Sequence, residues 1–113
     1  MVIVNLALAT ICFLNQCYPA LVGINTPEGE YKLVQLITDQ PGYGGDVLKF
    51  TENETTWYAI HRVWLLKPKQ HRLDRLSSNN AKDRVITAGC INVMPKVYEE
   101  LKSCCSNDTL IIK

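Results

Sequence analysis

The sequence predicts a mostly β domain, a β-rich α+β fold with one helix in its C-terminal half. Two segments, 31–37 and 55–66, alternate in polarity or are rich in β-branched and aromatic residues, as strands are. Turn-forming residues separate them, and only the stretch after Pro95 repeats apolar residues at helical spacing. With 113 residues, 47% of them hydrophobic and 20% charged, the chain has the composition of one globular domain.

The chain begins with a mostly apolar stretch, residues 2–14, which Asn5 interrupts. This stretch is too short to span a bilayer. It fits the hydrophobic core of a signal peptide, although no Lys or Arg precedes it and no clear small-residue cleavage site follows. It fits equally a buried strand or helix, or part of the first strands of a domain. We therefore treat residues 1–22 as an apolar N-terminal segment and residues 23–113 as the main domain.

Turns and short strands are expected between residues 25 and 66. In chain order we predict a turn at 25–30, a strand at 31–37, a glycine-rich loop at 40–46, a short strand at 47–50, a polar turn at 51–54 and a longer strand at 55–66. The strand at 31–37 is apolar on most of both faces.

A polar surface excursion is expected next. Residues 67–83 are polar and charged and lack a clean apolar period, apart from one helical turn at 70–76. Residues 85–86 would then restart a strand, and that strand would deliver Cys90 to a tight turn.

The C-terminal part predicts one helix and one strand. Pro95 suits the first position of a helix, because its missing N–H costs nothing there. Val97, Tyr98 and Leu101 would then share one apolar face of that helix. The apolar stretch 109–112 follows a polar turn and predicts a closing strand.

Charge and motifs exclude two classes of function. Twelve basic and eleven acidic residues give a net charge of +1, and no basic patch runs through the chain. We therefore expect no nucleic-acid partner. The glycine-rich stretch 42–45 lacks the Lys-Ser/Thr pair that completes a phosphate-binding loop.

The five cysteines leave the redox compartment open. Their odd number predicts at least one free thiol unless chains cross-link. Cys104 and Cys105 are adjacent and are poorly placed to bridge each other. A zinc site formed by these two with Cys12 and Cys17 is conceivable, but the spacing matches none of the common zinc knuckles.

Cys90 is the candidate nucleophile. Gly89 directly before it lets the backbone bend sharply and lie close to a ligand. A cysteine at such a turn can present its sulfur, while nearby backbone N–H groups can face an oxyanion. The alternative is that Cys90 is a small buried hydrophobic residue, as most free cysteines are.

A cysteine nucleophile needs a base, because an ordinary thiol is mostly protonated at neutral pH. The chain has two histidines, His61 and His71. An imidazole within reach of Cys90 would favour a thiolate–imidazolium pair and later protonate a leaving amine. We expect His61 to be this base because it lies in a predicted strand, whereas His71 lies in the polar excursion.

Three motifs in order give the sequence a specific resemblance to a known family. They are Thr26-Pro27-Glu28-Gly29-Glu30-Tyr31 before a strand, Ile60-His61 within a strand, and Thr87, Gly89, Cys90, Ile91 and Asn92 around the cysteine. From about Gly23 to its end, the chain resembles the L,D-transpeptidase catalytic domain of bacterial cell-wall enzymes.

The resemblance implies a β-sandwich or barrel in which Cys90 and His61 meet across a groove. Cys90 would attack the carbonyl between the third and fourth residues of a peptidoglycan stem peptide, and His61 would act as general base and acid. Backbone N–H groups around Gly89 and Cys90 would hold the oxyanion. An amine acceptor would give a cross-link, and water would give an L,D-carboxypeptidase. No metal or organic cofactor is implied.

The sequence departs from the family pattern at three points. Ala88 replaces a second histidine, so another group, such as a backbone carbonyl, would have to orient the catalytic imidazole. Arg62 replaces a common glycine after His61 and would narrow the groove or bind a substrate carboxylate. The segment between His61 and Cys90 is longer than usual, and His71 fits the usual spacing better.

Further substrate contacts are expected from Arg84, Asn92 and Thr87, which flank the nucleophile. The alternative is a solvated arginine and an asparagine that caps the turn. Two other functions stay open: an inactive relative that only binds peptidoglycan or a partner, and a metal- or redox-sensing cysteine protein. We expect the cell envelope or periplasm as the location, or the cytoplasm if the N-terminal segment is not a leader.

Overall fold

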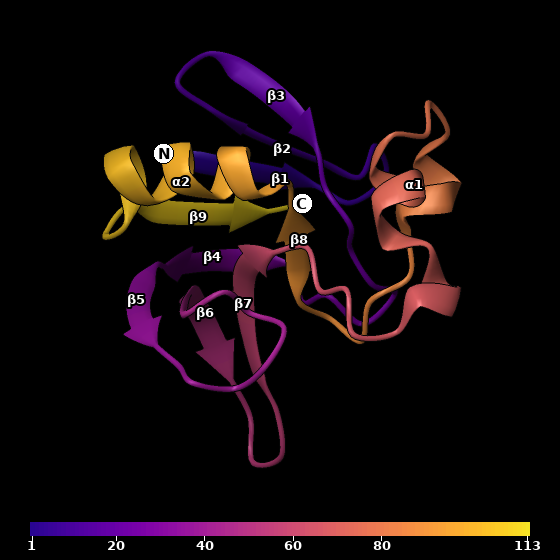
Figure 1. Cartoon of the computed structure of the whole chain (residues 1–113). Helices are drawn as coiled ribbons and strands as arrows, with labels where there is room; N and C mark the ends of the chain where they lie inside the picture. Colours follow the sequence, from indigo (N-terminus) through magenta and orange to yellow (C-terminus); the bar gives the residue numbers. More distant parts are fainter.

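The structure is a computed structural model that describes residues 1–113, and it contains two β-sheets (Figure 1). The five-stranded sheet has the order β3 (Gln16–Pro19), β2 (Thr10–Phe13), β1 (Val2–Asn5), β9 (Thr109–Ile112), β4 (Gly29–Lys32). The four-stranded sheet has the order β5 (Val34–Ile37), β6 (Asp46–Glu52), β7 (Trp57–Arg62), β8 (Ile91–Val93). The mostly β prediction is confirmed.

Two α-helices and two 3-10 turns complete the fold. They are η1 (Pro68–Gln70), α1 (Arg72–Leu76), η2 (Ala81–Arg84) and α2 (Pro95–Cys105). The predicted helical turn at 70–76 and the helix starting at Pro95 are therefore both present. Val97, Tyr98 and Leu101 are buried on one face of α2, as their spacing predicted. No helix has the length and apolar character that a membrane crossing requires.

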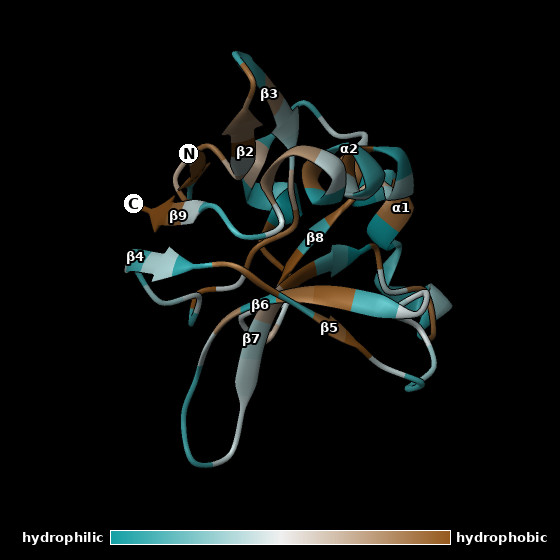
Figure 2. Cartoon of the chain, turned by 90° about the vertical axis from the view of Figure 1, so that its left-hand side faces the viewer, coloured by the Kyte–Doolittle hydropathy of each residue, from teal (hydrophilic) through white to brown (hydrophobic).

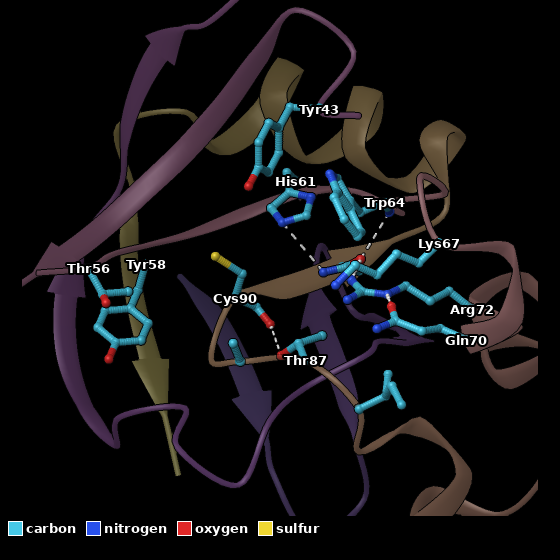
Figure 3. Close-up of a pocket in the computed structure, with 13 residues that line it drawn as sticks. Tyr43, Thr56, Tyr58, His61, Trp64, Lys67, Gln70, Arg72, Thr87 and Cys90 are labelled. Carbon is cyan, nitrogen blue, oxygen red and sulfur yellow. Dashed lines mark hydrogen bonds between the residues drawn. The ribbon is translucent and has the colours of Figure 1, made fainter. Parts of the chain in front are cut away.

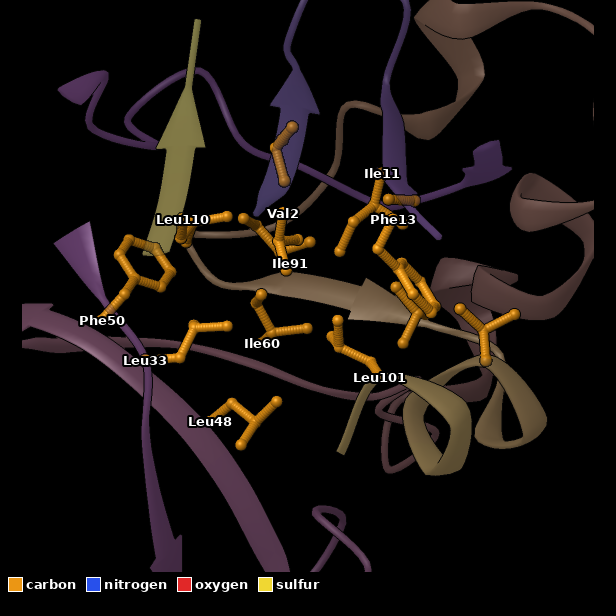
Figure 4. Close-up of a cluster of buried hydrophobic side chains, with 14 of the residues drawn as sticks. Val2, Ile11, Phe13, Leu33, Leu48, Phe50, Ile60, Ile91, Leu101 and Leu110 are labelled. Carbon is orange, nitrogen blue, oxygen red and sulfur yellow. The ribbon is translucent and has the colours of Figure 1, made fainter. Parts of the chain in front are cut away.

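One hydrophobic core joins both sheets to α2. Figure 4 shows one cluster of buried side chains from the two sheets, from the segment between β4 and β5, and from Leu101 of the helix; the residues are Val2, Ile11, Leu33, Leu48, Ile60, Ile91 and Leu110. Their removal from water is the main favourable contribution to folding. By contrast, Val34, Leu36 and Ile37 are exposed on β5, an edge strand that is brown in the hydropathy colouring of Figure 2.

The N-terminal segment supplies three strands of the larger sheet. Strand β1 pairs antiparallel with β2 and parallel with β9, so it lies in the middle of that sheet. Val2, Val4 and Ile11 are fully buried in the common core. Among the alternatives for residues 2–14, the structure has the buried-strand arrangement.

The predicted single strand at 31–37 is wrong, because the chain changes sheets at Leu33. Strand β4 pairs with β9, whereas β5 pairs with β6 in the other sheet. The N–H of Leu33 donates to the carbonyl of Asp108 (3.0 Å), outside both ladders. The side chain of Leu33 is fully buried between the sheets. An apolar pattern on both faces therefore reflects a crossing between sheets, not one strand buried on both sides.

Two strand predictions near the nucleophile also need correction. Residues 85–86 form no strand, only a single bridge between Val85 and Val22, and strand β8 begins after Cys90. Strand β7 ends at Arg62, four residues before the predicted end, because the N–H of Trp64 donates to the side chain of Asn92 (3.0 Å) and leaves the ladder.

The structure contains two disulfides and one free thiol. Cys12 and Cys17 face each other across the β2–β3 hairpin and are bonded. Cys104 and Cys105 are also bonded to each other, so the expectation that neighbours do not pair is wrong: a ring closes across their shared peptide bond. Because disulfide sulfurs are not thiolates, these four residues do not supply the zinc ligand set considered above. Cys90 is free.

The crossing at Leu33 makes a direct test of the core. We expect Leu33→Ala to lower the free energy of unfolding by about 2–5 kcal/mol, because it leaves a cavity between the sheets. Ile37→Ala is the matched control. Ile37 ends strand β5, which begins directly after the crossing, and its side chain is 89% exposed, so its truncation should change the free energy of unfolding little. Urea denaturation of both variants measures the difference, and equal stabilities would contradict this account of the crossing.

Candidate active site

One pocket contains most of the residues that the sequence pointed to. It has a volume of about 410 Å³ and opens between β7, the nucleophile turn and the polar excursion (Figure 3). The residues that line it are Tyr43, Thr56, Tyr58, His61, Trp64, Lys67, Gln70, Arg72, Ile86, Thr87, Ala88, Cys90 and Asn92. The side chains of Cys90 and His61 extend into it from neighbouring elements, with the sulfur and the imidazole on the same side of the pocket.

The turn before Cys90 requires glycine. Gly89 has a φ of 140°, and a Cβ there would lie 2.4 Å from the ring of Tyr58. Thr87 fixes the turn from inside, since its hydroxyl accepts the N–H of Gly89 (3.1 Å) and donates to the carbonyl of Cys90 (2.6 Å). The sulfur of Cys90 lies 4.0 Å from the carbonyl oxygen of Trp57. The sequence-predicted turn is therefore present, although it enters a strand and does not follow one.

The Thr26-Pro27 motif braces this turn from a distance in sequence. The hydroxyl of Thr26 accepts the N–H of Gly23 (2.9 Å) and donates to the carbonyl of Gly89 (2.9 Å), and this threonine is buried. Gly23 lies so close that a Cβ on it would come within 2.3 Å of the Thr87 carbonyl oxygen. Residues 23–26 thus hold the nucleophile turn in place, which the sequence did not reveal.

His61 is positioned by the pairing of two strands and by its own neighbour. Strands β7 and β8 are parallel, with His61 opposite Asn92. The Nδ1 atom of His61 lies 2.7 Å from the carbonyl oxygen of Arg62, so Nδ1 carries the proton. Its Nε2 atom is left as the acceptor, 3.5 Å from the side-chain nitrogen of Asn92. A backbone carbonyl therefore orients the imidazole ring.

Both candidate catalytic groups are neutral at pH 7. Burial is the main cause that lowers the pKa of His61 to about 4; the hydrogen bond to the Arg62 carbonyl opposes this shift, and the nearby charge of Arg72 adds to it. Burial raises the pKa of the Cys90 thiol above its ordinary value, against the backbone of Ala59 and the charge of Arg72. The expected thiolate–imidazolium pair is thus not the resting state, because the pocket disfavours both charges.

His71 lies apart from the nucleophile. It is exposed at the start of α1 with a φ of 52°, and its Nδ1 atom lies 3.8 Å from a carboxylate oxygen of Asp74. It lines a neighbouring pocket and not the one that contains Cys90. Of the two histidines, only His61 shares a pocket with the cysteine.

Two predicted substrate residues are not in the pocket. Arg62 lies on the other side of β7, where it pairs with Asp46 (2.8 Å) and Glu99 (2.5 Å) and stacks on Tyr98. Arg84 is buried, and its guanidinium donates only to backbone carbonyls, those of Leu8, Ala9 and Ser78. The alternation of side chains along a strand explains why Arg62 lies outside the pocket: as the neighbour of His61 in β7, it must point to the opposite face of the sheet.

Asn92 and Thr87 do line the pocket. Asn92 is fully buried, and its side-chain oxygen accepts the N–H of Trp64 (3.0 Å) and a guanidinium N–H of Arg72 (2.9 Å). One amide thus connects the imidazole of His61, the end of β7 and the polar excursion. Thr87 is held in the turn by its two hydrogen bonds, so its hydroxyl supports Cys90.

Arg72 is the main residue that sequence reasoning missed. It enters the pocket from α1, with its guanidinium over the ring of Trp64 (5.2 Å to the centroid). Tyr43 from the glycine-rich loop also lines the pocket and meets His61 edge-on (4.7 Å between centroids). No local pattern marks Arg72, which lies among other charged residues in 67–83. Only the fold of the excursion back over β8 brings it to Cys90.

The fold of this chain has counterparts among solved structures. No protein-family model matches the sequence, and no curated protein matches it. Solved structures do match, over essentially the whole of this chain. The L,D-transpeptidase (Yku) from Stackebrandtia nassauensis aligns with a TM-score of 0.59 and 15% identity over 99% of this chain. The fold is that of an L,D-transpeptidase domain.

Two further structures agree with this fold. The L,D-transpeptidase from Xylanimonas cellulosilytica aligns with a TM-score of 0.61 and 13% identity over 99% of this chain. The Bdellovibrio bacteriovorus protein Bd1075 aligns with a TM-score of 0.63 and 17% identity over 100% of it. The alignments cover 54%, 59% and 47% of the Stackebrandtia, Xylanimonas and Bdellovibrio chains, respectively. The chain thus spans about half the length of these structures.

The buried imidazole predicts how stability depends on pH. The folded pKa of His61, about 4, lies below the ordinary value of 6.5, so the unfolded chain binds more protons between these values. We expect the free energy of unfolding to fall as the pH drops from about 6.5 to 4, by about 3 kcal/mol from this residue. Urea denaturation across this range measures it, with His61→Gln as the comparison; an unchanged slope in that variant would contradict the assignment.

Proposed function

We propose that this chain is a peptidoglycan L,D-transpeptidase that acts through an acyl-enzyme on Cys90. One observation carries the proposal: the single free cysteine shares a pocket with an imidazole whose Nδ1–H is bound to a backbone carbonyl (2.7 Å) and whose Nε2 can accept a proton. The L,D-transpeptidase fold around this pair supports the choice of reaction and of substrate, the stem peptide of peptidoglycan.

In the proposed reaction, the sulfur of Cys90 attacks the carbonyl carbon between the third and fourth residues of a stem peptide. Because the thiol and the imidazole are both neutral at rest, the thiol proton passes to Nε2 of His61 as the carbon–sulfur bond forms. The carbonyl of Arg62 stabilises the resulting imidazolium through Nδ1. His61 then protonates the leaving amine as the carbon–nitrogen bond breaks.

The oxyanion of the intermediate needs hydrogen-bond donors near the sulfur. The N–H of Cys90 bonds to no acceptor in the chain and is therefore free for this role. The N–H of Gly89, which the sequence also nominated, is taken by the Thr87 hydroxyl (3.1 Å). Gly89 therefore contributes through its backbone conformation, since a side chain there would clash with Tyr58.

The acceptor of the acyl group defines two versions of the same activity. Attack by the side-chain amine of a second stem peptide regenerates the thiol and forms a cross-link. Attack by water releases a shortened peptide and makes the protein an L,D-carboxypeptidase. Neither version requires a metal or an organic cofactor. Cross-linking would take place in the cell envelope or periplasm, whereas trimming of stem peptides is also compatible with the cytoplasm.

A second candidate is an inactive relative that binds peptidoglycan peptides without cleaving them. Two observations favour it: Ala88 lines the pocket where the family has a histidine, and burial raises the thiol pKa. Both would slow attack by Cys90. The pocket itself would still accept a peptide.

Intact-mass spectrometry of the protein with a synthetic stem tetrapeptide or a carbapenem separates these two functions. We expect a covalent adduct that Cys90→Ala abolishes. His61→Ala should slow adduct formation by about 100-fold or more, because it removes the base.

His71→Ala is the matched control, since this imidazole is exposed outside the pocket, and it should react like the unmodified chain. Circular dichroism establishes that each variant is folded. Folded protein without any adduct would favour the inactive relative. Loss of the adduct with His71→Ala and its retention with His61→Ala would reverse the assignment of the base.

A further inference from the structure

The side chain of Arg62 forms an ion-pair network on the face of β7 that points away from the pocket. One terminal nitrogen of its guanidinium donates to a carboxylate oxygen of Asp46 (2.8 Å), and the other donates to Glu99 of α2 (2.5 Å). The guanidinium also lies over the ring of Tyr98, 4.3 Å from its centroid. Only 16% of the Arg62 side chain is exposed, so this arginine connects β6, β7 and α2 with little freedom to move.

Asp46 is the most buried partner in this network. Its second carboxylate oxygen accepts hydrogen bonds from the side chain of Gln35 (2.9 Å) and from the hydroxyl of Tyr98 (3.1 Å). Burial raises the pKa of Asp46, but the hydrogen bonds that it accepts, that of Arg62 first, outweigh burial and hold this pKa below its ordinary value. Asp46 is therefore ionised at neutral pH, and a carboxylate bound on both oxygens is a rigid partner for a guanidinium.

The same arginine holds the glycine-rich loop. The nitrogen that binds the Asp46 carboxylate also donates to the backbone carbonyls of Tyr43 (3.2 Å) and Asp46 (3.4 Å). Gly44 permits this approach, because a Cβ there would lie 2.8 Å from Cδ of Arg62. The ring of Tyr43 meets the imidazole of His61 edge-on, with 4.7 Å between centroids (Figure 3). The aromatic wall beside the imidazole is thus tied to Arg62.

The backbone of Arg62 contacts the imidazole directly. Its carbonyl oxygen lies 2.7 Å from Nδ1 of His61. Arg62 is the last residue of β7, and two residues later the N–H of Trp64 donates to the side chain of Asn92 and not to a neighbouring strand. This carbonyl therefore lies near the end of the strand pairing. The anchored side chain of Arg62 adds a restraint at the point where the ladder stops.

We infer that Arg62 is a positioning residue: its ion pairs on the far face of β7 fix the carbonyl and the loop that orient the imidazole of His61. This inference rests on the proposed function for the role of that imidazole. Arg62 does not line the pocket, so its loss should slow proton transfer and leave ligand binding unchanged. A misplaced base slows a reaction by about 10- to 100-fold.

The rate of Cys90 acylation by a carbapenem, followed by intact-mass spectrometry over a range of concentrations, is the first test. Arg62→Met keeps a side chain that can pack on Tyr98 but has no donors. We expect its first-order rate constant at saturating carbapenem to fall about 10- to 100-fold, with the half-saturating concentration unchanged. Arg62→Lys retains one charged donor and should recover part of the rate.

Nitrogen-15 NMR of the imidazole tests the same inference without requiring catalysis. In the unmodified chain we expect a single neutral tautomer of His61, with the proton on Nδ1. Arg62→Met should give a mixture of both tautomers, because the acceptor carbonyl is no longer held in place. Either an unchanged rate constant or an unchanged tautomer in folded Arg62→Met would overturn the inference.

Lys102→Gln is the matched control. Lys102 pairs with the same two carboxylates, those of Asp46 (3.5 Å) and Glu99 (3.2 Å), but with no residue of β7. It should change neither the rate constant nor the tautomer. An effect as large as that of Arg62→Met would assign the change to the charge of the network and overturn the positioning role.

Glu99→Gln provides a second variant in case Arg62→Met does not fold. The Glu99 side chain is 53% exposed, and its loss breaks one of the two ion pairs of Arg62. We expect acylation to slow by about 3- to 10-fold, because the Asp46 anchor remains. A rate constant equal to that of the unmodified chain would contradict the inference.

The two measurements together distinguish this inference from the proposed function. If neither the unmodified chain nor any variant forms an adduct but Arg62→Met still mixes the tautomers of His61, the catalytic proposal fails and the positioning of the imidazole stands. If every variant is acylated at the rate of the unmodified chain, the catalytic proposal stands and the positioning role fails.

Discussion

The parallel pairing of β7 with β8 is the constraint on which the candidate site depends. Its register sets His61 opposite Asn92 and leaves Cys90 directly before the first paired residue of β8. A slip of one residue would turn His61 to the face where Arg62 now pairs with Asp46, because side chains alternate along a strand. The buried Ile60 and Ile91, which face each other in this ladder, oppose such a slip.

This pairing also explains why the site is polar on one face and apolar on the other. Ile60 and Ile91 point into the common core, while His61 and Asn92 point toward the pocket. Parallel strands are usually buried on both faces, and the pocket is the exception here. The buried amide of Asn92 makes that exception tolerable, since its oxygen accepts two donors and its nitrogen faces the imidazole.

Local signals in the sequence were sufficient for some of the fold. Pro95 and the spacing of Val97, Tyr98 and Leu101 predicted α2, since caps and amphipathic spacing act within a few residues. The strand at 109–112 followed from its apolar composition. The change of sheets at Leu33 did not, because it depends on a hydrogen bond to Asp108, far away in the chain.

The same distinction applies to the site. Cys90 and His61 could be nominated from motifs, and Asn92 and Thr87 from their place beside the cysteine. The substrate contacts predicted for Arg62 and Arg84 were wrong, because neither side chain lies in the pocket. Adjacency in sequence does not determine on which face of a strand a side chain lies or how deeply it is buried. The neutral state of the Cys90–His61 pair depends on burial, which no motif encodes.

The pocket is lined by two kinds of segment: paired strands with the nucleophile turn, which carry the proposed catalytic residues, and the polar excursion, which carries the two cations of the pocket. Cys90, His61 and Asn92 are fixed by strand pairing and by the turn that Thr26 braces, so they can change little without loss of the core. Lys67 and Arg72 come from the polar excursion, whose residues are mostly exposed. Loops carried by a rigid scaffold tolerate substitution more readily than strands do. The excursion could therefore change what the pocket binds while the strands preserve the attacking pair.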